Sequence, residues 1–347
     1  MIDIEKIRIT PEILNLIGEI DEFKGGWQLL GKMAPDRLLA LKKVATIESI
    51  GSSTRIEGSK LSDQEVERLL SHVDALSFQS RDEQEVAGYA FVCEKIFENF
   101  EMIPLSENAI KQMHIWLLQY CDKDAGHRGE YKKVPIRIEA FDANKKSVGV
   151  VFETEPPFQT PIKMEELVAW TRESLEKKTL HPLIVIGIFV VLFLAIHPFQ
   201  DGNGRLSRLL TTMLLMKCGY QYVPYSSMES IIEASKEGYY LALQRTQKSW
   251  QKGHPDWTPW LMFFLTCLQR QKQHLEQKVA MEQMLTHLPE LPKKILELVK
   301  VRGRLKIGEI EQLTQENRNT LKKALAGLVH NNLLKLHGKG KTSWYTF

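Results

Sequence analysis

The spacing of apolar residues along the chain predicts a mainly α-helical protein. Residues 183–196 are uncharged and apolar and are bounded by Pro182 and Pro198, which predicts a buried core helix. At fourteen residues this run is too short to span a bilayer, which takes about 20. The helical period of about 3.6 residues predicts further helices at 37–50, 84–100, 205–216, 230–250 and 257–271, and two more that open at Ser62 and Ser106.

One stretch has the pattern of strands instead. Apolar residues alternate over 134–138 and again over 148–152, on either side of the polar stretch 142–146. A period of two around a short polar tip predicts a β-hairpin.

A change in composition near residue 289 predicts a separate C-terminal domain. A polar helical linker at 271–288 leads into a proline-containing stretch at 288–292. Beyond it the pattern predicts three helices followed by two strands, the order of a small α+β winged helix with residues 338–341 as its wing. The predicted helices are 293–301, 306–313 and 317–331, and the strands are 333–336 and 343–347.

Charge is distributed unevenly between the two parts of the chain. The net charge of +3 is too small to indicate a polyanionic partner, but residues 289–347 carry twelve Lys or Arg against five Asp or Glu. This local charge of +7 leaves −4 for the rest. Two partners stay open for this region, another protein or duplex DNA. DNA would be contacted by Arg318, Asn319, Lys322 and Lys323, with the wing on phosphate.

Composition and cysteine spacing favour a cytoplasmic protein. Hydrophobic residues at 43% and charged residues at 26% are typical of soluble domains. The four cysteines are scattered, without Cys-x-x-Cys pairs or zinc spacing, so we expect them to be reduced. Residues 1–10 mix charges with isoleucine and so lack the apolar core of a signal peptide. We expect no membrane association.

Residues 197–208, His-Pro-Phe-Gln-Asp-Gly-Asn-Gly-Arg-Leu-Ser-Arg, concentrate the candidate chemistry. The Gly-Asn-Gly of 202–204 falls at a predicted helix N-terminus, where unpaired N–H groups and the helix dipole attract anions. Arg205 and Arg208 follow within one turn, and their planar guanidinium groups suit phosphate oxygens. Asp201 is placed to hold a magnesium ion against phosphates. His197 is a candidate base for a hydroxyl nucleophile.

Simpler interpretations exist for the fragments of this segment. A histidine after an apolar helix is commonly a core or capping residue, and Gly-Asn-Gly is commonly a turn. A dinucleotide-binding loop is disfavoured, because Ser207 stands at the third glycine position and no strand precedes the segment.

The joined segment resembles the signature of the Fic family, His-x-Phe-x-Asp-Gly-Asn-Gly-Arg-x-x-Arg, at every fixed position. The resemblance covers about residues 35–270 and implies a helical Fic fold with a β-hairpin flap that pairs with the target. Most Fic enzymes transfer AMP from ATP to a protein hydroxyl and release pyrophosphate. For individual residues the resemblance implies that His197 is the base, that Asp201 binds Mg²⁺, that Phe199 anchors the loop, that Gly202, Asn203 and Gly204 surround the phosphates, and that Arg205 and Arg208 hold the β and γ phosphates.

A second segment resembles the autoinhibitory pattern of Fic proteins, Ser/Thr-x-x-x-Glu-Gly/Asn. Ser53, Glu57 and Gly58 occupy its fixed positions on a helix expected at about 45–58. The resemblance implies that the Glu57 carboxylate forms a bidentate pair with Arg208 and so competes with the γ phosphate. The alternative is an ordinary helix end with Gly58 as its cap and Glu57 in solvent.

Two further assignments follow from the same resemblance. Phe152 and Thr154 of the flap would line the nucleotide, together with Glu153. Tyr239 and Tyr240 would lie near adenine and ribose, although two aromatic residues on a helix also fit core packing.

The sequence therefore predicts an N-terminal helical region (1–100), a Fic catalytic domain (101–270), a linker helix and the C-terminal domain. The leading hypothesis is an autoinhibited, Mg²⁺-dependent protein adenylyltransferase that acts on Tyr, Ser or Thr of a partner or of itself. Alternatives are transfer of another phosphate-containing group, a bifunctional enzyme that also removes AMP, and a DNA-bound regulator that senses nucleotide. The target and the oligomeric state stay open, a homodimer included.

Overall fold

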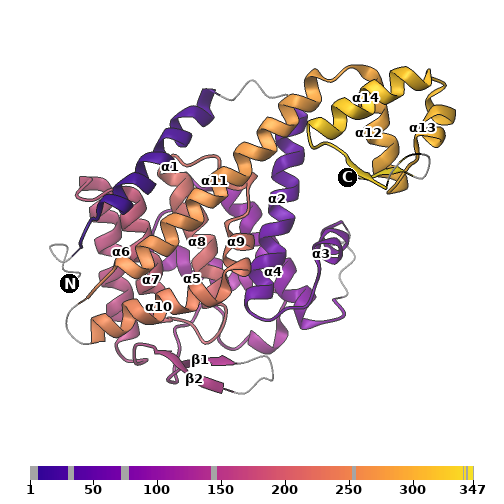
Figure 1. The fold of residues 1–347 in the computed structure, drawn as a ribbon. Coiled ribbons are helices and arrows are strands. Elements are labelled where there is room, and N and C mark those ends of the chain that lie inside the picture. Colours follow the sequence, from indigo (N-terminus) through magenta and orange to yellow (C-terminus); the bar gives the residue numbers. More distant parts are fainter. Residues whose placement is uncertain are drawn as a thin grey trace. The chain divides into compact units, whose positions relative to one another are not determined.

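The computed structural model describes residues 7–29, 35–71, 78–141, 147–251, 255–338, 340 and 343–346. The chain divides into two compact units, Met1–Leu275 and Glu276–Phe347. Figure 1 shows the helices and strands along the chain.

Two consecutive helices form the centre of the first unit. Helix α7 (Pro182–Ile196) is buried at every position from Leu183 onward, which confirms the predicted core helix. Helix α8 (Asn203–Lys217) packs against α7 and begins two residues earlier than the sequence predicts. The short connection 197–202 between them therefore starts and ends in the interior of the unit.

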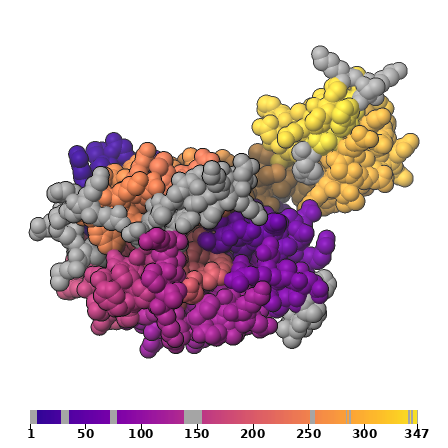
Figure 2. Space-filling model, turned by 90° about the horizontal axis from the view of Figure 1, so that it is seen from below, coloured from indigo at the N-terminus to yellow at the C-terminus, as the bar shows by residue number. Residues whose placement is uncertain are grey.

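Further helices surround this pair (Figure 1). Helix α6 packs on α7, α4 and α5 pack on α8, and α2 packs on both α8 and α9. In Figure 2 the purple surface of the N-terminal helices adjoins the magenta surface of the residues that follow them. The bounds of these elements are α1 (Pro11–Leu29), α2 (Pro35–Ile56), α3 (Asp63–Leu70), α4 (Arg81–Asn99), α5 (Glu107–Leu117), α6 (Thr160–Lys177), α9 (Met228–Ala234), α10 (Lys236–Gln251) and α11 (Thr258–His287), with short 3-10 turns at Asp122–Asp124 and Val223–Tyr225.

The two predicted helix starts at serine are confirmed. The Ser62 side chain accepts a hydrogen bond from the Glu65 amide, and the Glu65 carboxylate accepts one from the Ser62 amide, which completes a capping box on α3. Ser106 caps α5 through the Ala109 amide at 3.2 Å. Side-chain oxygens satisfy amides that have no partner within the helix.

The predicted hairpin is present, although its first strand starts later than predicted. Strands β1 (Arg137–Phe141) and β2 (Ser147–Glu153) pair antiparallel, with Ile138 opposite Phe152. The alternation at 134–136 was wrongly assigned to the strand, since Val134 precedes β1 and is 50% exposed. The predicted tip at 142–146 lies outside the described residues.

Three helix predictions are wrong in their bounds. Residues 230–250 form two helices, because the backbone of Ser235 leaves the helical region, with φ of −119° and ψ of 33°, and its hydroxyl donates a further hydrogen bond to the Ile231 carbonyl. The helix predicted at 257–271 and the linker helix predicted at 271–288 are one helix, α11, which neither glycine nor proline interrupts between Pro259 and Pro289. Likewise α2 runs through Gly51 to Ile56 as one helix.

The second unit has the predicted order of three helices and two strands. Strands β3 and β4 pair antiparallel, and the helices enclose a buried cluster of leucine, isoleucine and valine side chains. Lys339 and Lys341 of the predicted wing lie outside the described residues. The bounds are α12 (Glu290–Arg302), α13 (Ile307–Thr314), α14 (Arg318–His330), β3 (Lys335–His337) and β4 (Trp344–Thr346). Of the helices in the described ranges, none combines the length and the apolar character needed to cross a membrane.

Candidate active site

His197 lies at the end of α7 in a left-handed backbone conformation, with φ of 51°. Its Nδ1 lies 3.3 Å from the Leu194 carbonyl oxygen. A carbonyl only accepts, so Nδ1 carries the proton there, and in the neutral ring Nε2 is then the nitrogen that accepts one. Burial, helped by the charge of Lys132, lowers the pKa of His197 to about 4. The imidazole is therefore neutral near pH 7, the form that a base requires.

Asn203 and Gly202 fix the loop that follows His197. The Asn203 side chain accepts from the Phe199 amide at 2.9 Å and donates to the Phe199 carbonyl at 2.7 Å. Gly202 has a φ of 78°, which a side chain would strain, and an added Cβ would lie 3.3 Å from Leu117. The Asn203 side chain thus acts as a clamp within the loop. Contact of Gly202 and Asn203 with phosphates stays a prediction.

His114, whose apolar neighbours in the sequence predict a core histidine rather than a ligand, is fully buried and supports the same loop from α5. Its Nδ1 accepts from the Gly129 amide at 2.9 Å, so its Nε2 carries the proton and donates to the Asp201 carbonyl at 3.0 Å. Its ring stacks on Phe199, with 3.9 Å between ring centroids. Phe199 is fully buried, which agrees with its predicted anchoring role. A histidine among apolar residues offers no sequence signal for such contacts.

The first turn of α8 faces the carboxylate of Glu57. A Cβ built on Gly204 would lie 2.0 Å from Glu57 Oε1, so the carboxylate approaches the glycine backbone closely. This end of the helix attracts negative charge. The described structure therefore places an anionic side chain at the site predicted for phosphates.

Arg208 joins α8 to the end of α2. Its Nη2 donates to Glu57 Oε1 at 2.8 Å and to the Ser53 carbonyl at 2.9 Å, and its Nε donates to Ser53 Oγ at 2.7 Å. The expected bidentate pair is therefore corrected: one carboxylate oxygen of Glu57 accepts from Nη2, and the neighbouring Nε donates to Ser53. Gly58 follows with a φ of 112° and ends the helical segment as a cap. Glu57 and Arg208 nevertheless pair as expected.

Arg205 and Arg208 pair with different residues. Its side chain is 2% exposed, and its guanidinium pairs with Glu85 at 3.0 Å and with Asp201 at 3.2 Å. Arg81 of α4 also donates to Asp201, at 2.7 Å. A phosphate-binding role for Arg205 stays a prediction, since the guanidinium is committed to carboxylates here. Glu85, the partner of Arg205, and Arg81, a partner of Asp201, both belong to α4, and Arg81 precedes Asp201 by 120 residues.

Asp201 retains the properties of a metal ligand. Burial alone would raise its pKa, but Arg205, the Gly202 amide and Arg81 outweigh burial and hold the pKa below its usual value. The carboxylate is thus ionised and its side chain is 39% exposed. Within the described residues, no three His, Cys, Asp or Glu side chains converge as a metal site. A magnesium ion at Asp201 would take its other ligands from phosphate oxygens and water, as this ion commonly does.

The remaining predicted nucleotide contacts are only partly described. Tyr239 on α10 is 4% exposed, and its ring centroid lies 5.8 Å from that of Trp260 and 5.8 Å from that of Phe263, as core packing predicts. Burial raises the pKa of Tyr240 to about 12. The Phe152 side chain lies outside the described residues. Nucleotide contact by these residues stays a prediction.

The Thr154 hydroxyl makes two hydrogen bonds within the protein. It donates to the Ile136 carbonyl at 2.7 Å and accepts from Lys132 Nζ at 2.8 Å. Its contact with nucleotide is likewise a prediction.

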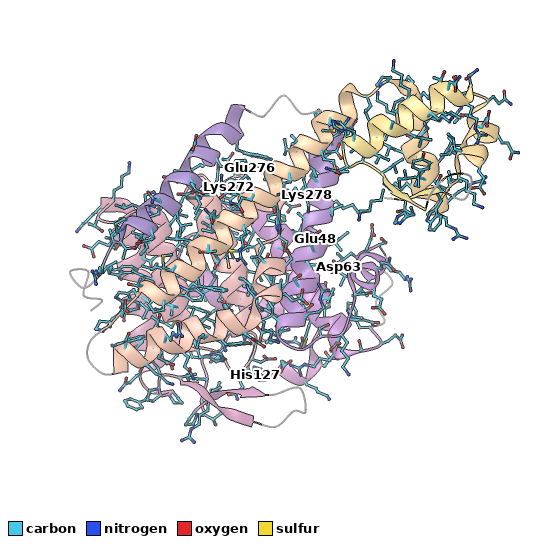
Figure 3. All side chains as sticks on the ribbon, viewed as in Figure 1. Glu48, Asp63, His127, Lys272, Glu276 and Lys278 are labelled. Carbon is cyan, nitrogen blue, oxygen red and sulfur yellow. The ribbon has the colours of Figure 1, made fainter. Side chains whose placement is uncertain are left out.

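Ion pairs fix the end of α2 near the site. Arg55 pairs with Glu233 of α9 at 2.7 Å and with Asp63 at 2.8 Å, and Figure 3 shows Asp63 beside α2. Lys236 donates to the Ile56 carbonyl at 2.7 Å. These contacts hold the two residues before Glu57 against α9 and α10.

The loop between α7 and α8 lies within a segment that matches a known protein family. The sequence model of the Fic/DOC family matches residues 104–215, which include His197 and all of the loop. The chain carries a Fic domain. Ser53, Glu57 and the two tyrosines lie outside the matched residues, so their roles rest on this structure and on the sequence pattern.

Relatives with this domain include named adenylyltransferases. A probable protein adenylyltransferase of Aquifex aeolicus is 27% identical over 182 residues, 50% of this chain and 52% of that protein. The protein adenylyltransferase Fic of Drosophila melanogaster is 27% identical over 231 residues, 66% of this chain and 42% of that protein. This chain thus spans about half the length of the curated relatives it matches.

Solved structures share the fold. A Fic family protein from Desulfovibrio desulfuricans has a TM-score of 0.62 at 24% identity, covering 98% of this chain and 97% of that one. A Fic domain-containing signaling protein from Bacteroides thetaiotaomicron has a TM-score of 0.61 at 23% identity, covering 76% of this chain and 97% of that one. The mainly helical Fic fold is confirmed.

Proposed function

We propose that this chain is a protein adenylyltransferase that moves AMP from ATP to a hydroxyl side chain. The observation that carries the proposal is the junction of α7 and α8, which brings a neutral imidazole, an anion-attracting helix end and the Arg208 guanidinium together. The adenylyltransferase names of relatives at 27% identity support the same reaction.

The reaction follows from the placement of these groups. Nε2 of His197 takes the proton from the attacking hydroxyl as its oxygen bonds to the α phosphorus. The bond from that phosphorus to the α–β bridging oxygen breaks, and pyrophosphate leaves with the electron pair. Amides at the start of α8 and the Arg208 guanidinium face the negative charge of the phosphates.

Asp201 is the residue that would hold magnesium in this reaction. Its ionised, partly exposed carboxylate fits that role, and Arg81 would have to release Oδ2. Bound magnesium would neutralise charge on the phosphate oxygens.

Glu57 would inhibit the reaction by filling the phosphate site. Its carboxylate lies against Gly204 and accepts from Arg208, two groups that the phosphates would need. The parent chain would thus transfer AMP slowly until the end of α2 moves.

The same site supports a second reaction, removal of AMP from a modified target. Glu57 contributes to the electrostatic environment of His197, and a carboxylate so placed would orient water for attack on the AMP phosphorus. Release of free AMP from a modified protein by the parent, but not by Glu57→Gln, would distinguish removal from transfer.

The test of transfer is a mass search for added AMP on purified Glu57→Gly protein incubated with ATP and Mg²⁺. We expect an AMP adduct, and a loss of about 100-fold or more when His197→Ala is added. Lys133→Met, an exposed position one residue past Lys132, serves as the control and should label normally. Equal labelling with and without His197 would contradict the assigned base, and modification by a phosphoryl group would contradict AMP transfer.

A second function, binding of duplex DNA by the C-terminal unit, is favoured by the charge of residues 317–347. They include six Lys or Arg and neither Asp nor Glu. On α14, Asn319, Lys322, Lys323 and the small Ala326 are exposed, while Leu321, Leu325 and Leu328 are buried. An exposed, acid-free helix of this kind suits a major groove.

Fluorescence anisotropy of a labelled duplex with the full chain tests this function. We expect binding that weakens steeply with salt and falls at least about tenfold in Lys322→Glu/Lys323→Glu. The matched control reverses two exposed charges on α12, Lys294→Glu/Lys300→Glu, and should change affinity less. Binding that is absent or insensitive to salt would refute the function and leave a protein partner for this unit.

A further inference from the structure

A buried lysine joins the base of the hairpin to the end of α7. Lys132 is 3% exposed, and its Nζ donates to the Ile196 carbonyl at 2.8 Å and to Thr154 Oγ1 at 2.8 Å. Its backbone amide donates to the Pro198 carbonyl at 2.8 Å. Lys132 therefore holds the chain on both sides of His197.

Burial of this ammonium group requires a reason. Lysine side chains are usually exposed because moving a charge out of water is costly, and the neighbouring Lys133 is exposed. Lys132 is stabilised by Ile196, the last residue of α7, whose carbonyl lies at the negative end of the helix. Because that carbonyl belongs to the peptide joining Ile196 to His197, its hydrogen bond restrains the backbone from which the imidazole projects.

The second acceptor connects this restraint to the hairpin. Thr154 directly follows β2, and its hydroxyl donates to the Ile136 carbonyl just before β1. The Glu155 amide donates to the Ala195 carbonyl at 3.2 Å. The base of the hairpin is thus bonded to the last turn of α7.

We propose that Lys132 is a positioning residue for the transfer reaction, which fixes the His197 backbone and keeps its imidazole in the neutral, proton-accepting form. The inference rests on the proposed function. Lys132 acts through His197 and has no assigned contact with substrate.

The charges around His197 determine in which direction its pKa should change when Lys132 is replaced. Lys132 disfavours the imidazolium, whereas Glu57 and Asp201 favour it. Replacing Lys132 with a neutral side chain leaves the two carboxylates unopposed and raises the pKa of His197. Protonation of the ring then competes with its role as base at a higher pH.

The test compares Lys132→Met, Lys132→Arg and the exposed control Lys133→Met, each in the Glu57→Gly background. Burial lowers the pKa of Lys132 to about 8, so the comparison is made at pH 7, where the lysine is mostly charged. For Lys132→Met we expect kcat to fall at least about tenfold at this pH, with the KM for ATP changed less than about threefold. The acid limb of the kcat profile should move up by about one pH unit or more. Lys132→Arg keeps the charge and should leave that limb in place, and Lys133→Met should match the background protein.

Histidine-selective NMR titration measures the pKa of His197 without any assay of transfer. An upward shift in Lys132→Met, absent in Lys132→Arg, supports the proposal even if no AMP acceptor is found, which separates its outcome from that of the proposed function. An unchanged His197 pKa in folded Lys132→Met, or unchanged kcat, overturns it. If Lys132→Met does not fold, a His197 pKa in Lys132→Arg that has moved to its usual value overturns it instead.

Discussion

In the proposed function, Gly204 is the residue at which the ATP phosphates and the Glu57 carboxylate would exclude each other. Its missing side chain lets Glu57 Oε1 approach to 2.0 Å from the position of a Cβ. The amides at this helix end attract either a phosphate or a carboxylate. Both anions would also need Arg208. The proposed inhibition would therefore need no distortion of the site, only its occupation by Glu57.

His114 makes the folded protein sensitive to mild acid. Burial lowers the pKa of His114 to about 4 from an ordinary value of 6.5. The unfolded chain thus binds a proton between these values and the folded chain does not, so stability is full above pH 6.5 and falls as the pH is lowered toward 4. From pH 7 to pH 5 we expect a loss of about 2 kcal/mol from this residue.

Urea unfolding at the two pH values checks this expectation. His114→Gln removes the titrating ring, so the difference between pH 7 and pH 5 should shrink by about 2 kcal/mol relative to the parent. A pH difference that is the same in both proteins would show that the buried ring does not titrate as described.

At the scale of elements, the sequence predicted helices whose bounds are set by residues within or next to the helix itself. The prolines that bound an uncharged apolar run predicted α7, and Ser62 predicted the start of α3. Ser235 was missed because a serine within an apolar pattern does not by itself indicate a break. The polar helix predicted at 271–288 is confirmed, but the change from apolar to polar residues was taken for the end of the preceding helix, although no helix breaker separates the two.

The site was predicted where its residues are adjacent in sequence. The order from His197 to Arg208 and the pattern at Glu57 named the interacting groups. Lys132 and Arg81 were missed because their partners lie 64 and 120 residues away. A lysine or arginine in a polar stretch is expected in solvent, so only the fold reveals these contacts.

The end of α2 is held by ion pairs that should set the strength of inhibition. Arg55 and Glu233 are 22% and 30% exposed, which makes their interaction worth about 1 kcal/mol. Glu233→Gln should weaken the docking of Glu57 and raise AMP transfer by the parent up to about fivefold.

The double variant provides the control for this prediction. In the Glu57→Gly background the inhibitor is already gone, so Glu233→Gln should leave the rate of transfer unchanged. A similar increase in both backgrounds would mean that Glu233 acts on catalysis rather than on inhibition.

At the scale of the whole molecule, every residue assigned to the reaction belongs to the first unit, residues 1–275. The domain boundary nevertheless falls inside α11, which runs unbroken to His287. Leu275 is fully buried, and Gln271 donates to the Ser226 carbonyl at 2.6 Å. The second half of α11 therefore cannot be treated as a dispensable linker from residue 271 onward.

Shortening the chain tests this boundary. A Glu57→Gly chain that ends at His287 should transfer AMP within about threefold of the full chain, because it keeps α11 whole. A chain that ends at Gln271 loses Leu275 and should unfold about 2 kcal/mol more easily in urea. Equal stability of the two shortened chains would contradict the placement of the boundary.

The central claim is that Glu57 occupies the phosphate site of an otherwise competent adenylyltransferase. The most direct measurement is the initial rate at which α-phosphate-labelled ATP labels protein in the presence of Mg²⁺. Glu57→Gly should label itself or a target at least about tenfold faster than the parent. Glu101→Gly, in an exposed turn, should match the parent. Equal rates for Glu57→Gly and the parent would contradict the account.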